Sequence, residues 1–173
     1  MVGVEYVVFD VETTGMRPED GHAVVELAGQ RVHGREVTGT FDYIVNPGRA
    51  VDQEAAAVHG ITDEVIAHEG RPLIEVVPAF MLFCEGATLV AHNIRFDLGF
   101  LNNHLRQLGL PPAANRTIDT IELAKQKGVV VASYSLAYLA KHFQILQPTS
   151  HRALADVEVT RELLWKLLDI KGS

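Results

Sequence analysis

The sequence predicts an α/β fold in which helices flank a mixed sheet of about five strands. Three observations lead to this prediction. Apolar, strand-like segments fill most of the first 45 residues, and apolar residues with helical spacing take over after residue 72. Beyond that point, short strand-like segments alternate with helical ones, as they do around a sheet that is partly parallel.

The N-terminal part should form three neighbouring strands. Residues 4–11 are apolar at positions that face both sides, which is typical of a central strand. Two further strands are expected over 24–32 and 38–45, joined through His33-Gly34-Arg35 and ended by Asn46-Pro47-Gly48. This arrangement predicts a hairpin-like meander.

The C-terminal part should supply most of the helices. We expect helices over 72–83, 95–108, 120–127, 135–143 and 151–168, and short strands over 88–91 and 116–118. The last helix carries an apolar stripe at Leu154, Val157, Leu164 and Leu168, and Ser150 can cap its start.

Composition predicts a single domain over residues 1–173. The chain is 47% apolar and 21% charged, and it is long enough to bury a sizeable core. It has no apolar run of about 18 residues and no export signal at its N-terminus. The single cysteine, Cys84, lies in an apolar stretch and is expected to be a buried thiol, so we expect a cytoplasmic protein.

The net charge restricts the nucleic-acid partners that are compatible with the chain. A formal charge of -7 argues against a broad basic footprint along duplex DNA. An enzyme that grips only a few nucleotides is still compatible with this charge, because bound divalent cations supply positive charge locally.

Two acids interrupt the first strand. Because alternate residues of a strand share a face, Asp10 and Glu12 point the same way as Val8. Their side chains can reach one ion, or bracket two ions about 3.5–4 Å apart. A strand end with two solvated acids is the alternative, but a charge beside a buried run needs a partner or a metal.

Two later segments carry acids near the starts of helices. Asp97, in AHNIRFDLGFL, shares a helical stripe with Leu101, although the helix dipole alone also favours an acid in the first turn. In SHRALADVE, His151 lies at the mouth of the last helix, and Asp156 lies just over one turn in, near the apolar face.

These four acids and one histidine fit a single chemistry. Carboxylate ligands suit Mg²⁺ or Mn²⁺, whereas a zinc site usually has more His or Cys ligands. Two such ions stabilise the attacking and leaving oxygens in phosphodiester cleavage. A histidine such as His151 can take the proton from the attacking water, because imidazole titrates near neutral pH.

Three ordered motifs carry a resemblance to a known family. FDVETTG, HNIRFD and HRALAD resemble the motifs of the DEDDh 3′–5′ exonucleases, which have a ribonuclease-H-like fold. The likeness extends over residues 4–168. Within this family, TTGM, GHAVVEL and VNPGRAVDQEAAAVHGITDE are most similar to the proofreading epsilon subunit of bacterial DNA polymerase III.

The resemblance implies a role for individual residues. Asp10, Glu12, Asp97 and Asp156 would hold two Mg²⁺ or Mn²⁺ ions, and His151 would be the general base. The residues implied to bind the terminal nucleotide are Thr13, Thr14, Met16, Glu54, His59, Asn93 and Phe96. For Glu54 and His59, a purely structural loop is the alternative.

Two further acids receive no catalytic role. Asp119 is followed three residues later by Glu122, which indicates a variant of the capping box at a helix start. Glu26, in VVELAG, fits the family pattern, but the sequence suggests no chemical role for it.

The resemblance implies a metal-dependent exonuclease that releases nucleoside monophosphates from single-stranded or frayed 3′ ends of DNA, in proofreading or repair. Short RNA stays open as the substrate. A phosphatase of the haloacid dehalogenase type also begins with a strand and D-x-E-T, but that class has Asp at the second position and needs a later Lys motif. A non-catalytic binding module is disfavoured, because all five catalytic positions are filled.

The resemblance also implies a partner, the polymerase subunit of DNA polymerase III. Epsilon subunits bind it through a C-terminal tail, whereas the sequence here ends at Ser173. Action as a stand-alone nuclease is therefore the alternative, and no membrane partner is expected.

Overall fold

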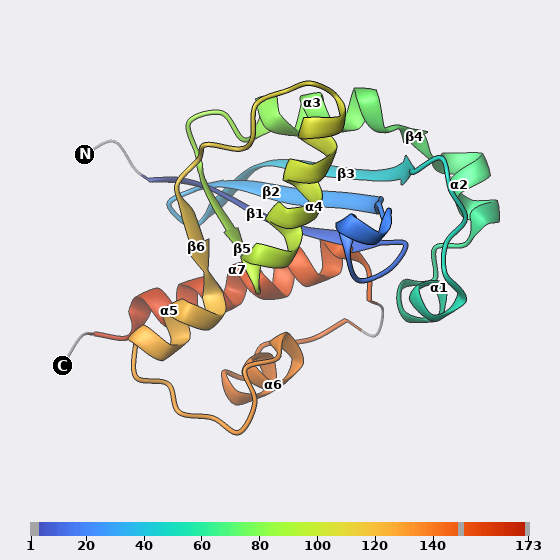
Figure 1. Cartoon of the computed structure of the whole chain (residues 1–173). Coiled ribbons are helices and arrows are strands. Elements are labelled where there is room, and N and C mark those ends of the chain that lie inside the picture. Colours follow the sequence, from blue (N-terminus) through green and yellow to red (C-terminus); the bar gives the residue numbers. More distant parts are fainter. Residues whose placement is uncertain (1–3, 149–150, 172–173) are drawn as a thin grey trace.

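A mixed sheet forms the centre of the computed structural model, which describes residues 4–148 and 151–171 (Figure 1). Within these residues the strands are β1 (Glu5–Thr13), β2 (Val24–His33), β3 (Glu36–Asn46), β4 (Arg71–Pro72), β5 (Thr88–Ala91) and β6 (Thr117–Asp119). The helices are η1 (Pro18–Asp20), α1 (Gln53–His59), α2 (Asp63–Glu69), α3 (Leu73–Phe83), α4 (Ile94–Gln107), α5 (Thr120–Gln126), α6 (Leu136–His142) and α7 (Ala153–Asp169).

The strand order is β4-β3-β2-β1-β5-β6. The first three strands form the expected antiparallel meander, and β5 and β6 add to β1 in parallel. The predicted α/β class with a mixed sheet is confirmed. The sheet has one strand more than the five expected, the two-residue β4 beside β3.

Strand β1 separates two differently built faces of the sheet. Phe9 and Val11 point toward α3 and α4, whereas Val8 points toward α7. Because side chains alternate along a strand, Asp10 and Glu12 continue the Val8 face. The strand also runs past its expected end at residue 11, so both acids lie within the sheet.

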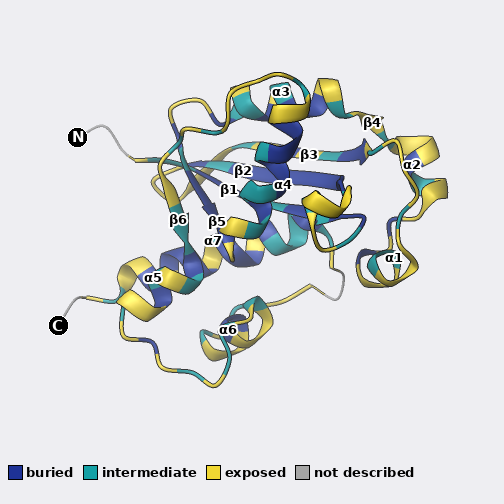
Figure 2. Cartoon of the chain, viewed as in Figure 1, coloured by how far each residue is buried: buried dark blue, intermediate teal, exposed yellow. Residues whose placement is uncertain are grey.

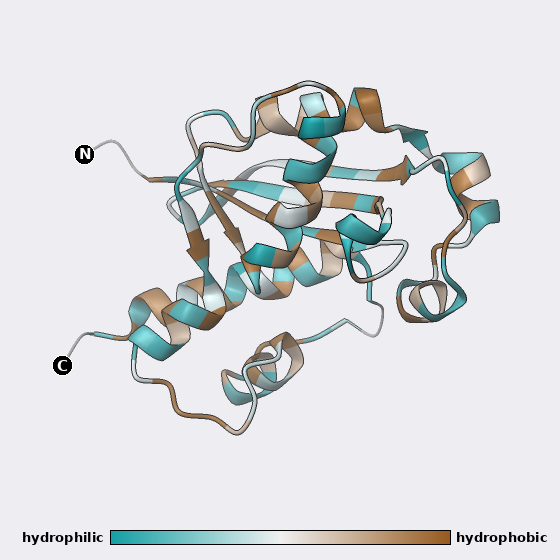
Figure 3. Ribbon diagram, in the orientation of Figure 1, coloured by the Kyte–Doolittle hydropathy of each residue, from teal (hydrophilic) through white to brown (hydrophobic). Residues whose placement is uncertain are grey.

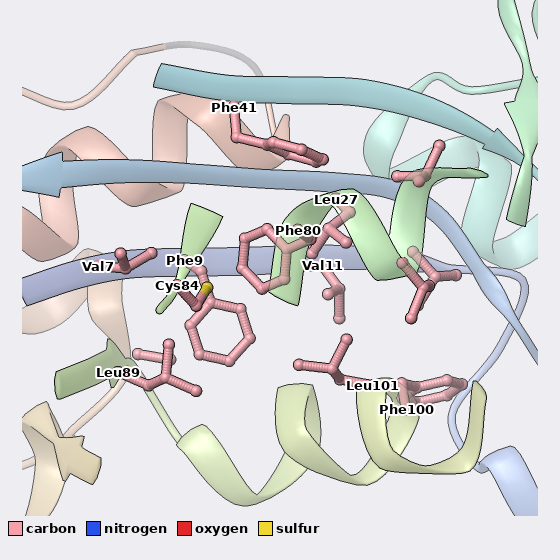
Figure 4. Packing of buried hydrophobic residues seen from close by; sticks show 14 of the residues in the cluster. Val7, Phe9, Val11, Leu27, Phe41, Phe80, Cys84, Leu89, Phe100 and Leu101 are labelled. Carbon is pink, nitrogen blue, oxygen red and sulfur yellow. The ribbon is translucent and has the colours of Figure 1, made fainter. Parts of the chain in front are cut away.

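An aromatic cluster fills the face covered by α3 and α4 (Figure 4). Phe80 of α3 is fully buried, and its ring centroid lies 5.6 Å from that of Phe9 and 5.2 Å from that of Phe41. Cys84 is fully buried as expected, and burial raises the pKa of its thiol to about 12. This face holds the cluster with the most buried residues, and hydrophobic burial is the dominant favourable contribution to folding.

Helix α7 covers the other face, and α5 and α6 pack against α7 (Figure 1). The sheet between the two helical layers is largely buried (Figure 2), and α4 and α7 alternate hydrophobic and hydrophilic bands (Figure 3). Val157 and Leu164 of the expected stripe on α7 are fully buried, but Leu168 is 38% exposed. Leu167, the preceding residue, is fully buried against α5 and α6 instead, so the last turn directs Leu167 rather than Leu168 to the core.

Three helices differ from the sequence prediction. Residues 53–69, for which the sequence predicts no helix, form α1 and α2, and Thr62 caps the second of them through the Val65 N–H. Each has only seven residues, too few for apolar periodicity to reveal. Helix α7 begins at Ala153 rather than His151. None of the described helices is both long and apolar enough to cross a membrane.

Phe80→Ala should lower the free energy of unfolding by about 3–5 kcal/mol, because it empties a fully enclosed site in the aromatic cluster. Chemical denaturation measures the change. Leu82→Ala on the same helix is the matched control, since Leu82 is 73% exposed and should cost about 0.5 kcal/mol or less. Equal losses in the two variants would contradict the assigned packing of α3.

Candidate active site

Three carboxylates meet on the α7 face at the end of β1. Asp10 and Glu12 come from β1, and Asp156 comes from the first turn of α7. One oxygen from each lies within 4.8 Å of those of the other two, so all three can contact one ion. The sequence placed Asp156 just over one turn into the helix. It lies in the first turn because α7 starts two residues later than expected.

The predicted cap of α7, Ser150, lies outside the described residues. Arg152 occupies the N-cap position with extended backbone, and its side chain makes no capping hydrogen bond. The packing of Ala153 and Val157 against Val8 and Ala28 sets the height of the helix over the sheet. That contact brings Asp156 to the two acids of β1.

Asp97 approaches the same acids from α4. It lies in the first turn of that helix, is 2% exposed, and its Oδ1 accepts the Val11 N–H at 3.1 Å. The pairing of β1 with β5 ends at Val8 and Val90, so Asp97 satisfies a backbone donor beyond the last strand pair. The stripe predicted for α4 is confirmed, because Leu101 is buried with Asp97.

The four acids share a strongly unfavourable electrostatic environment. Burial, reinforced by the charge of Asp97, raises the pKa of Asp10 well above its usual range. Burial and the charge of Asp156 raise the pKa of Glu12 to about 8. Burial also raises the pKa of Asp97 and of Asp156. A divalent cation would relieve this repulsion, and a set of carboxylate oxygens suits a hard cation.

His151 joins the acids from the segment before α7. Its side chain is exposed to solvent. Burial raises the pKa of Asp156, and the positive charge of protonated His151 opposes that rise. A solvent-accessible imidazole beside the carboxylates is able to exchange a proton with water.

A pocket of about 370 Å³ opens beside Glu12. The substrate residues that sequence reasoning placed there and that do line it are Thr13, Met16, Glu54, His59 and Phe96. They come from the end of β1 and the loop after it, from α1 and from α4, and these segments are far apart in the sequence. Glu12 belongs both to this pocket and to the three-carboxylate group, so the pocket opens directly beside the acids.

His59 braces the wall of this pocket. Its Nδ1 accepts the Ile61 N–H at 3.1 Å, so Nε2 carries the proton and donates to the Thr13 carbonyl oxygen at 3.1 Å. Burial lowers the pKa of His59, which favours this neutral form. The register of β1 with β2 shifts between Glu12 and Thr13, where Val25 of β2 is skipped, and such irregularities are common beside active sites.

Two other expected substrate residues do not line the pocket. Thr14 is fully buried, and its hydroxyl oxygen accepts the Ala23 N–H at 3.0 Å, which ties the end of β1 to the start of β2. Asn93 is exposed and begins α4 in the left-handed conformation, with φ of 63°. Its N–H donates to Asp119.

The two acids without a catalytic role both bind the start of a helix. Asp119 caps α5 as predicted, by accepting the Ile121 N–H, and it also accepts the Ile94 N–H at the start of α4. Sequence reasoning missed the contacts of Glu26, which binds Arg152 and Ala153 next to His151. The available signal was an acid inside an apolar strand segment, VVELAG.

Comparisons with known proteins agree with this geometry. The RNase T model of the exonuclease family matches residues 7–164. Members of this family depend on divalent metal ions. The match confirms the predicted resemblance to 3′–5′ exonucleases and removes the phosphatase alternative.

The similar curated proteins include polymerases. A PolC-type DNA polymerase III of Lactococcus lactis is 37% identical over 164 residues, and that of Halalkalibacterium halodurans is 38% identical over 165 residues. These matches cover 95% of this chain but only 10% and 11% of the two polymerases. The chain therefore spans about a tenth of the length of these relatives.

Two solved structures have a similar fold. Exonuclease X in complex with 5′ overhanging duplex DNA has a TM-score of 0.75 at 27% identity and covers 97% of this chain and 93% of its own. Exonuclease I of E. coli with a dT13 oligonucleotide has a TM-score of 0.87 at 18% identity, with 96% of this chain and 41% of its own covered. These matches confirm the ribonuclease-H-like fold.

Glu12→Gln should stabilise the metal-free protein at alkaline pH. The folded state raises the pKa of Glu12 from 4.5 to about 8, so it binds an extra proton, and its stability falls as pH rises through that range. The variant lacks this titration, and in chelator near pH 8 its Tm should exceed that of the wild type by about 2–4 °C or more.

Thermal unfolding with chelator across this pH range measures the effect, and added Mg²⁺ or Mn²⁺ should raise the Tm of the wild type more than that of the variant. Glu122→Gln is the matched control, because Lys125 lowers the pKa of that exposed acid and its removal should bring no gain. A wild-type Tm that does not decline toward pH 8 would be inconsistent with a repulsive cluster.

Proposed function

This chain belongs to the RNase T exonuclease family, and we propose that it hydrolyses DNA from the 3′ end, releasing nucleoside monophosphates in proofreading or repair. One observation carries the proposal. Asp10, Glu12 and Asp156 hold oxygens within 4.8 Å of one another, and Glu12 also lines a pocket large enough for a terminal nucleotide. The phosphate of a nucleotide in that pocket would lie against the carboxylates.

The four acids and His151 have different roles in the proposed reaction. Asp10, Glu12, Asp97 and Asp156 would hold two Mg²⁺ or Mn²⁺ ions, which supply positive charge that stabilises the attacking and leaving oxygens. An imidazole nitrogen of His151 accepts the proton of the attacking water. The exposed position of His151 beside Asp156 supports this role, because water and the phosphate can both reach it.

The pocket residues position the terminal nucleotide. Met16 and Phe96 offer apolar surface for the base, and the carboxylate of Glu54 can accept a hydrogen bond from the 3′-hydroxyl group. His59 supports the Thr13 backbone rather than contacting the nucleotide through its ring nitrogens, since both are already paired. These contacts select an end, not a base sequence, which suits exonuclease action.

The relatives support DNA over RNA as the substrate. The PolC-type proteins are DNA polymerases, and Exonuclease X was solved with a DNA duplex carrying an overhang. We propose that this chain likewise acts on single-stranded or frayed DNA ends, in association with a polymerase and in the cytoplasm. The alternatives are a nuclease that acts without a polymerase and an exoribonuclease that acts on short RNA.

An end-labelled degradation assay tests the proposal. It compares single-stranded DNA, mismatched primer–template DNA and short RNA, with Mg²⁺, with Mn²⁺ and with chelator. We expect stepwise loss of 3′ nucleotides from DNA. Asp10→Ala should reduce the rate about 10³-fold or more, because a lost ligand removes several kcal/mol of charge stabilisation. Circular dichroism should show that the variant keeps its fold. Full activity of Asp10→Ala would overturn the two-metal hypothesis.

His151→Ala should slow cleavage by about 10²–10⁴-fold, because the general base is lost. The loss should shrink at higher pH, where hydroxide replaces activated water. Single-turnover rates over a pH series measure both effects. His142→Ala, an exposed histidine on α6, serves as the control and should keep the wild-type rate. An unchanged rate for His151→Ala would exclude it as the base.

A further inference from the structure

Glu26 is a buried acid that the proposed chemistry does not use. It lies on β2 directly opposite Glu12 of β1, and therefore on the sheet face that α7 covers. Its side chain is 1% exposed. Although it is close to the carboxylate group, it does not belong to the three acids whose oxygens converge.

The start of α7 occupies both carboxylate oxygens of Glu26. Arg152 Nε donates to Oε1 at 3.0 Å and to Oε2 at 3.1 Å, and Arg152 Nη2 donates to Oε1 at 2.6 Å. The Ala153 N–H donates to Oε2 at 2.9 Å. Three N–H groups therefore hold the carboxylate, and the single Arg152 Nε–H is shared between its two oxygens. This separates Glu26 from the metal-binding acids.

These contacts replace the local cap that α7 lacks. The first N–H groups of a helix need acceptors from outside the helix, and the Arg152 side chain caps none of them. Glu26 supplies one acceptor from 127 residues away, and its negative charge is favourable at a helix N-terminus. The forked contact with the guanidinium group also fixes the Arg152 side chain in direction.

His151 immediately precedes Arg152, the residue that Glu26 binds. Arg152 has extended backbone with φ of -131°, so the chain direction at His151 follows from where Arg152 is anchored. We propose that Glu26 is a positioning residue that acts through Arg152 to place the His151 imidazole against the carboxylate group. The inference rests on the proposed exonuclease function, and Glu26 itself contacts neither nucleotide nor metal.

Paired kinetics test this role. Glu26→Gln puts an amide donor against the donors of Arg152 and Ala153, and it should lower kcat about 10–100-fold, the cost expected for a displaced catalytic group. KM should change less than about threefold, because the pocket is built from β1, α1 and α4. In the His151→Ala background, Glu26→Gln should have less than about threefold further effect, because the group it positions is gone.

Stability is measured in parallel, because loss of a buried partner also weakens the fold. All rates are taken well below the Tm of each variant. Arg152→Lys is the milder variant; it keeps the charge but loses the fork, and should lower kcat about tenfold. Glu5→Gln is the matched control, since it breaks a carboxylate–arginine pair with Arg31 between the same two strands, far from the site. It should leave kcat unchanged.

The outcomes separate this inference from the proposed function. If Glu26→Gln and Arg152→Lys lower Tm but keep the wild-type kcat, Glu26 is only structural and the positioning role is wrong. An equal kcat loss with and without His151 also overturns it. If Asp10→Ala instead keeps the nuclease activity of the wild type, the proposed function itself is refuted.

Discussion

Mutual repulsion among buried and half-buried carboxylates is the constraint on which the rest of the structure depends. Asp10, Glu12, Asp97 and Asp156 are brought together although burial raises the pKa of each one. Such a cluster does not form for its own stability, because every charge added makes the next less favourable. Rigid elements must therefore hold the acids in place: two lie on one strand, and each of the others lies in the first turn of a long helix.

Both of those helices begin at the site, and both are held there by acids that are not part of it. Asp119 accepts the Ile94 N–H at the start of α4, and Glu26 accepts the Ala153 N–H at the start of α7. In each case the acceptor lies on a strand of the sheet or at its end, rather than at the N-cap position of the helix. The sheet thus sets the position of Asp97 and Asp156 through backbone hydrogen bonds as well as through packing.

Local sequence pattern predicted the parts of this arrangement that depend on short-range geometry. Alternation along β1 correctly placed Asp10 and Glu12 on one face, and the bounds of β5 agree with those expected. Contacts across the chain were beyond such reasoning. Glu26 meets Arg152 across 126 positions, and no periodicity of either segment signals this pair. Nor could spacing show that Thr14 turns inward to hold the Ala23 N–H.

The core and the site are linked by the register of β1. Phe9 packs on Phe80 while the adjacent Asp10 faces α7, so a slip of one residue would exchange the aromatic ring and the carboxylate between the two faces. Such a slip would expose apolar surface at a large cost in free energy. Packing of the core therefore fixes the register of β1, and with it the positions of Asp10 and Glu12. The shift in the register of β1 with β2 comes only after Glu12. Pairing is thus regular through both acids and becomes irregular at Thr13, where the chain leaves the sheet to form the pocket.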